Sequence, residues 1–167
     1  MVLMMEQSYL QNHYEIIENE YGYQFRTIAG VDYFLTFLSY PTVSDLLSVN
    51  IYMFNIERAS MHDTQNVGQD DVKVRNTILY VLDMFFKEHE DALITICDVN
   101  DGKQFARRRL FDSWFRKFNN NRLRKIESEC MVGETITSVS LMFSVNIECQ
   151  EELQSAFLEL VNINFYN

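Results

Sequence analysis

Residues 71–97 read DVKVRNTILYVLDMFFKEHEDALITIC, and this stretch decides the fold. Apolar side chains recur at helical spacing over residues 74–85, and Asp70 or Asp71 can cap this helix by accepting from its free amide groups. The continuous apolar run over 92–97 predicts a strand that is covered on both faces. A helix followed directly by such a strand indicates a layered architecture of helices against a sheet.

On both sides of this stretch, the apolar pattern changes between the period of a strand and the period of a helix. Alternation on either side of Gly30 predicts one hairpin, and alternation on either side of Gly133 predicts another. Residues 59–70 are polar and without a period, so a long loop is expected there. The expected elements are a short helix within residues 1–20, strands 21–25, 33–37 and 49–57, the helix and strand above, a helix over 102–118, strands 124–131 and 135–145, and a helix over 153–160.

These elements predict a single domain of the α+β class over residues 1–167. It has a mainly antiparallel sheet of about six strands, two central helices and a C-terminal helix. The length suits one domain, and a composition of 47% hydrophobic residues with one proline is that of a globular protein.

The cysteines and the N-terminus indicate a cytoplasmic protein. No cationic start with an apolar run resembles a signal peptide, and no stretch is apolar enough to span a bilayer, so no membrane contact is expected. Three widely spaced cysteines read as free thiols in a reducing compartment: Cys97, Cys130 and Cys149. The histidines His13, His62 and His89 lie on different elements, so no metal site is predicted.

The charge distribution is the strongest functional signal. Residues 103–125 hold nine of the fourteen Lys and Arg residues against the single acid Asp112, whereas the other residues hold five basic and 23 acidic side chains. An acidic protein surface or a compact anion therefore fits as partner, while the anionic remainder disfavours nucleic acid and self-association stays open. The predicted interaction surface comprises Arg108, Arg109, Arg116, Lys117, Arg122, Arg124 and Lys125. The alternative is a solvated stripe, since Asp112 stands four residues from two of these arginines.

Arg107 is the exception on the helix over 102–118. A rotation of 100° per residue places it in the middle of an apolar face, opposite the other arginines. A buried guanidinium requires an anionic partner. The carboxylates of Asp98 and Asp101 are the nearest in sequence, so either a structural ion pair or an anion-binding role is open. The face on which Arg107 lies is formed by Leu110, Phe111, Trp114 and Phe118.

Two resemblances extend this interpretation. The stretch ICDVNDGKQ over 96–104, continuing through Arg107, Arg109, Leu110, Phe111 and Trp114, resembles an uncharacterised family of small proteins from Bacteroides-type bacteria. The order of elements from Tyr23 onward is similar to that of the GNAT superfamily of acetyl-CoA-dependent N-acetyltransferases. The second is a likeness of topology, which does not by itself carry a function.

The GNAT resemblance implies particular residues for a cofactor. In that superfamily, a loop of pattern Q/R-x-x-G-x-G/A holds the pyrophosphate of acetyl-CoA through backbone amides. Gln65 and Gly68 match the first two positions, whereas Asp70 places a carboxylate at the third. Arg75 or Arg107 would contact the cofactor phosphates under this resemblance.

The same resemblance implies catalytic groups. Glu57 lies at the strand end where a general base is often found, although an exposed surface glutamate is the alternative. Residues 104–118 contain no tyrosine that would serve as the acid. Two hypotheses follow: a non-catalytic or catalytically divergent binding or regulatory domain that uses its basic helix, and an acetyl-CoA-dependent N-acyltransferase. The sequence favours the first and names no cofactor for it.

Overall fold

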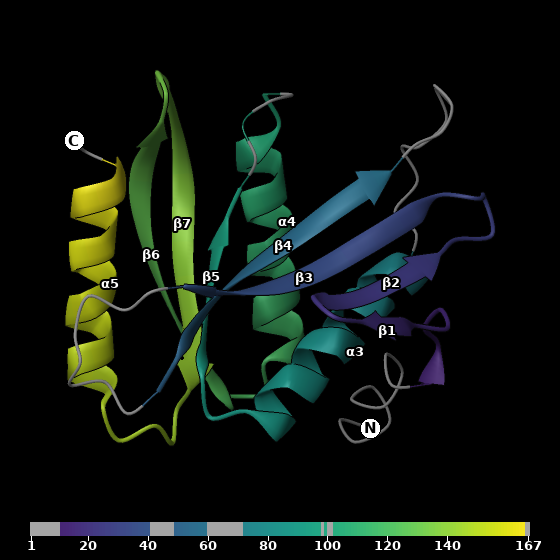
Figure 1. The fold of residues 1–167 in the computed structure, drawn as a ribbon, viewed down its shortest axis with the longest axis horizontal. Coiled ribbons are helices and arrows are strands. Elements are labelled where there is room, and N and C mark those ends of the chain that lie inside the picture. Colours follow the sequence, from purple (N-terminus) through teal and green to yellow (C-terminus); the bar gives the residue numbers. More distant parts are fainter. Residues whose placement is uncertain (1–10, 41–48, 60–71, 98, 100–101, 166–167) are drawn as a thin grey trace. The chain divides into compact units, whose positions relative to one another are not determined.

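The computed structural model describes residues 11–40, 49–59, 72–97, 99 and 102–165 (Figure 1). Within this part of the chain, three helices and a seven-stranded sheet form the α+β fold that the sequence predicted. The sheet has the order β1-β2-β3-β4-β5-β7-β6; β4 and β5 are parallel, and the pairs β1–β2, β2–β3, β5–β7 and β6–β7 are antiparallel. The bounds are β1 Ile17–Asn19, β2 Gly22–Arg26, β3 Asp32–Tyr40, β4 Ile51–Ala59, α3 Val72–Glu88, β5 Ala92–Ile96, α4 Gln104–Phe118, β6 Leu123–Val132, β7 Thr135–Ser144 and α5 Gln150–Phe165.

The chain divides into two compact units. Unit 1 comprises Met1–Leu38 and Phe54–His89, and unit 2 comprises Ser39–Met53 and Glu90–Asn167. Strands β3 and β4 each contribute residues to both units.

Unit 1 packs helix α3 against an aromatic core. The predicted apolar stripe of the helix is confirmed at Ile78, Val81 and Phe85, which are all buried. The ring of Phe85 stacks on that of Phe37 from β3, with 4.9 Å between ring centroids. The apolar stripe of α3 faces the core of unit 1, because removing its apolar area from water stabilises the folded state.

The short helix expected within residues 1–20 is wrong over residues 13–19. Residues 13–16 are irregular, and Ile17–Asn19 form strand β1, which pairs with β2. Tyr14 is buried as its spacing suggested, and its amide donates to Thr77 Oγ1 at 2.9 Å, but Ile17 is 58% exposed. Pairing with β2 supplies more backbone hydrogen bonds than one isolated helical turn, which is why tertiary context overrides the local pattern.

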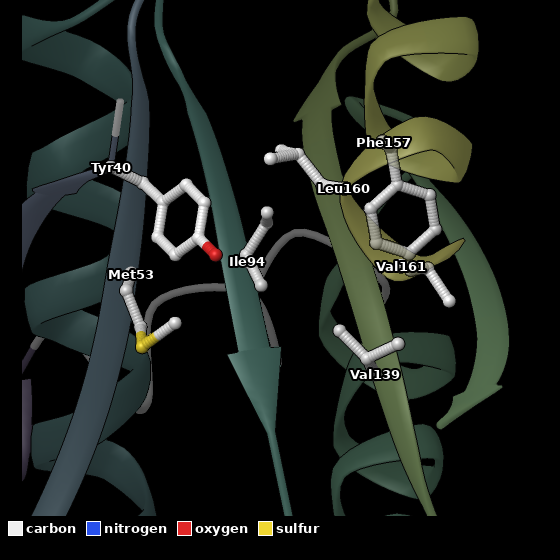
Figure 2. A pocket seen from close by; sticks show the side chains of 7 residues that line it. All are labelled: Tyr40, Met53, Ile94, Val139, Phe157, Leu160 and Val161. Atoms are coloured by element: carbon white, nitrogen blue, oxygen red, sulfur yellow. The ribbon is translucent and has the colours of Figure 1, made fainter. Parts of the chain in front are cut away.

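Unit 2 carries its apolar core on one face of the sheet. Side chains at paired positions share a face, so the register places Ile94, Leu141 and Ile126 together. Helix α5 covers this face through Leu153 and Phe157, both fully buried. A residual cavity of about 10 Å³ lies in this core, and its size and apolar lining make it a packing defect rather than a ligand site. Its lining comprises Tyr40, Met53, Ile94, Val139, Phe157, Leu160 and Val161 (Figure 2).

The three cysteines are free thiols, as predicted. Cys130 is fully buried, and its burial raises the pKa of the thiol, with the neighbouring Cys97 adding to the effect. A raised pKa leaves less reactive thiolate at neutral pH.

Candidate interaction surface

The second face of the unit 2 sheet carries polar and charged side chains as well as apolar ones. The register brings Thr95 of β5, Ser140 of β7 and Glu127 of β6 into one row, and the hydroxyls of Thr95 and Ser140 lie 2.7 Å apart. The next row joins Ser138 to Glu129. Helix α4 lies over this face, whereas α5 covers the opposite one (Figure 1). A third row on this face pairs the buried Leu93 and Met142 beside Lys125. The surface under α4 therefore combines hydrogen-bonding and charged groups with apolar ones.

Four alternating charges fix α4 to this face, and we call them the charge layer. Arg108 Nη2 lies 3.1 Å from Glu127 Oε2 and Arg108 Nε lies 4.0 Å from Asp112 Oδ2. Lys125 Nζ contacts Asp112 Oδ1 and lies 2.7 Å from Glu127 Oε1. The Lys125 side chain is only 10% exposed. Each cation of the layer thus touches both carboxylates, so the network neutralises itself locally.

The charge layer also governs the titration of Asp112. Burial alone would raise the pKa of this carboxyl group, but hydrogen bonds with Lys125 and Glu127 and the charges of Lys125 and Arg108 hold the pKa below its usual value. Because the folded pKa is depressed, the contribution of Asp112 to stability is present at neutral pH and is lost as the pH falls through the folded value.

Helix α4 begins in the same polar environment. Gln104 is buried, and its Nε2 donates to the carbonyl oxygen of Ile136 at 3.3 Å. Its Oε1 has no hydrogen-bond partner in the described part of the chain. This hydrogen bond ties the first residue of α4 to β7.

The rotation of α4 differs from the sequence prediction. Leu110 was expected on the buried face but is 37% exposed, while Arg108 and Asp112, expected on the opposite side, point toward the charge layer. Phe111 and Trp114 are half-buried, as their intermediate position on the helix requires. The predicted face is therefore wrong at Leu110, because ion pairs with Glu127 and Lys125 of β6 hold Arg108 and Asp112 toward the sheet. The predicted exposure of Arg109 and Arg116 is confirmed.

The exposed side of α4 carries unpaired cations next to apolar groups. Arg109 is exposed and has no partner among the described residues, and the exposed Arg116 donates from Nε to the backbone oxygen of Asp112 at 3.3 Å. Phe105 is 43% exposed one turn before Arg109. A surface with both apolar area and guanidinium groups that lack a carboxylate partner is suited to a protein partner.

The other predicted surface residues divide into separate regions. Lys117 and Arg122 are exposed at the end of α4 and in the turn that follows it. Arg124 lies on the α5 side of β6, where Nη1 donates to Gln150 Oε1 at 3.1 Å. Lys125 lies beneath α4, so the predicted surface is wrong in including it. Arg108 belongs with Lys125 in the charge layer.

Arg107 is half-buried on α4, at the edge of the face that meets the sheet. Its proposed partners Asp98 and Asp101 lie outside the described residues, so the structural ion pair remains a prediction.

The residues expected for acyl transfer are only partly described. Glu57 is exposed on β4, and Arg75 is half-buried on α3 with Nη2 donating to Asn76 Oδ1 at 3.2 Å. Gln65 and Gly68 lie outside the described residues. Glu57 and Arg75 belong to unit 1, whereas Arg107 belongs to unit 2.

The sequence interpretation missed Glu127, which is the second carboxylate of the charge layer. Lys125 and Glu127 stand two residues apart on a predicted strand, and such spacing places both on one face. This alternation was the available signal that the sheet face under α4 is charged.

The fold and this surface define an α+β protein with a basic helix held on its sheet by ion pairs. The chain belongs to DUF6169, a family of unknown function, whose model matches residues 70–159. No curated protein and no solved structure matches the chain. Among the described residues, no group of His, Cys, Asp and Glu side chains could hold a metal ion, and no helix there is long and apolar enough to cross a membrane.

Proposed function

We propose that this chain is a non-catalytic binding domain that holds an acidic protein partner on the exposed side of α4. One observation carries the proposal: Arg109 and Arg116 are exposed on this side, and neither is paired with a carboxylate among the described residues. Arg108, which also lies on α4, is instead neutralised by its ion pairs in the charge layer. The charges of these two guanidinium groups, on Arg109 and Arg116, are therefore available to the carboxylates of a partner.

The spacing of these arginines favours a protein over a compact anion. Seven residues separate Arg109 from Arg116, which is two helical turns or roughly 10 Å along the axis. One small anion does not bridge that distance, whereas carboxylates along a partner helix do. The exposed Phe105 and Leu110 add apolar area that a small anion would not use.

A cytoplasmic location and an origin in Bacteroides-type bacteria belong to the same proposal. The free thiols support the location, because such cysteines persist in a reducing compartment. The resemblance of residues 96–114 supports the origin.

The binding proposal predicts a charge-specific loss of affinity. The probe is a synthetic helical peptide with glutamate at every seventh residue and leucine beside it. Its binding is followed by calorimetry and by the fluorescence of Trp114, the single tryptophan. Arg109→Glu or Arg116→Glu should each weaken binding about tenfold, since each replaces an attraction by a repulsion. The matched variant Arg58→Glu, exposed on β4, should change the affinity less than twofold. Equal losses in all three variants would contradict the proposal, because they would reflect net charge alone.

The second candidate function is acetyl-CoA-dependent acyl transfer with a GNAT-like fold. The observation that favours it is the parallel pair β4–β5, joined by α3 within the element order on which the GNAT resemblance rests. Titration with acetyl-CoA by calorimetry distinguishes the two functions. A binding domain should give no heat at high ligand concentration. Micromolar binding that Gly68→Glu abolishes would favour the transferase instead.

A further inference from the structure

The exposed side of α5 is acidic and complements α4. Glu151, Glu152 and Glu159 are exposed there, and the helix Gln150–Phe165 contains no lysine or arginine. None of these glutamates has an ion pair within the described part of the chain. Leu158 adds an apolar group that is 43% exposed. The face thus combines carboxylates with apolar area, as the proposed partner of α4 requires.

The two helices match in spacing. Glu152 and Glu159 are seven residues apart on α5, as Arg109 and Arg116 are on α4, so both pairs are separated by two helical turns. A small exposed residue, Ser113 on α4 and Ser155 on α5, stands between the two charges of each pair. Two ion pairs can therefore form at once when the helices lie side by side.

The helix dipole explains only part of this pattern. Cations near a helix C-terminus and acids near an N-terminus stabilise their own helix, which accounts for Arg116 and Glu152. The effect falls off within one turn, so it accounts for neither Arg109 in the middle of α4 nor Glu159 in the second half of α5.

The two faces cannot meet within one molecule. Helix α4 contacts Lys125 and Glu127 on one face of β6, whereas α5 packs on the opposite face of the same sheet (Figure 1). All nine basic residues of unit 2 lie between Lys103 and Lys125, and its other charges are acidic. A second copy of the chain can supply the missing contact.

We propose that the partner of α4 is the α5 helix of another copy of this chain. This inference rests on the proposed function, because it identifies the acidic partner. The contact joins two different surfaces, so it is heterologous and continues from copy to copy unless the rotation closes a ring. At physiological ionic strength, screening over about 8 Å weakens the long-range repulsion between copies of net charge −10 more than it weakens ion pairs in contact.

A charge exchange between two variants tests the inference. Arg109→Glu/Arg116→Glu makes α4 acidic, and Glu152→Lys/Glu159→Lys makes α5 basic. Each variant alone has two like-charged faces and should sediment as a monomer. Their mixture restores opposite charges, so its weight-average mass should rise with concentration, as that of the unaltered chain is also expected to. The two variants have net charges of −14 and −6, so attraction between their total charges cannot explain association.

A matched control separates local pairing from a general effect of charge. Glu15→Lys/Glu20→Lys also has a net charge of −6, but its changes lie on exposed residues of unit 1. Because it keeps the basic α4 face and the acidic α5 face, it should self-associate as the unaltered chain is expected to, whereas the α5 variant of the same net charge should stay monomeric. A control that stays monomeric like the α5 variant would overturn the inference, because total charge alone would then set the association, and circular dichroism of each variant verifies that it is folded.

The remaining outcomes distinguish this inference from the proposed function. If the test mixture stays monomeric while Arg109→Glu still weakens binding of the glutamate peptide, α4 binds a different acidic protein and self-association is overturned. If the peptide also binds equally to all variants, both proposals fail.

Discussion

Replacing Gly22 with alanine is expected to lower the free energy of unfolding by about 3 kcal/mol or more, as backbone strain and overpacking together would. Gly22 has a φ of +152°, which side chains rarely permit. A Cβ atom there would overlap the backbone carbonyl oxygen of Leu35 on β3. This oxygen belongs to a fully buried residue in the paired strand, so it cannot move aside without breaking the β2–β3 register.

Urea denaturation measures this loss, with Gly30→Ala as the matched control. Gly30 also has a positive φ, of +79°, but no atom lies within 4 Å of the place that its Cβ atom would occupy. The control should therefore lose only about 1 kcal/mol, the cost of a left-handed conformation for alanine. If both variants lost the same free energy of unfolding, the close approach of β2 and β3 would not be what excludes a side chain at Gly22.

Replacing Lys125 with methionine is expected to lower the free energy of unfolding by about 2 to 3 kcal/mol, somewhat less than for a fully buried ion pair. The substitution keeps the length of the side chain but leaves Asp112 and Glu127 under α4 with Arg108 as their one remaining cation in the charge layer. Two carboxylates that share one cation repel each other. Thermal or urea unfolding measures the loss, and hydrogen exchange should show it first in α4.

Two further variants check the cause of that loss. Arg124→Met alters the neighbouring residue, which is exposed on the other side of β6, and should cost less than about 0.5 kcal/mol. Adding Asp112→Asn to Lys125→Met should restore part of the stability, because one of the two repelling charges is gone. A double variant that is less stable than Lys125→Met alone would contradict the assigned role of the charge layer.

Most of the fold could be predicted from the sequence, because the apolar residues of its helices and strands recur at regular spacing. The helix Val72–Glu88 and the strand Ala92–Ile96 lie where residues 71–97 predicted them. The hairpin around Gly133 is confirmed as β6–β7, since alternating side chains and a turn glycine together fix the register. Strand β1 was missed because three exposed residues carry no periodic signal of their own.

The surface was harder to predict than the fold. The nine cations are concentrated in one stretch of sequence, but their burial depends on residues elsewhere in the chain. Helical periodicity indicates which side of α4 is apolar, but it does not show that the sheet beneath the helix presents charged residues. Glu127 of β6 turns Arg108 inward, so a contact across nineteen residues decides which arginines remain exposed.

The position of β7 in the sheet has a consequence for the order in which unit 2 assembles. β7 joins β6 across a two-residue turn, a local contact that forms with little loss of chain entropy. The other neighbour of β7 is β5, and their pairing joins Leu93 to Met142. This pairing must close a long loop of intervening chain, so it is expected to form later. We therefore expect the nascent chain to make the hairpin first and to recruit β5 afterwards, with the helix between them in sequence packing last.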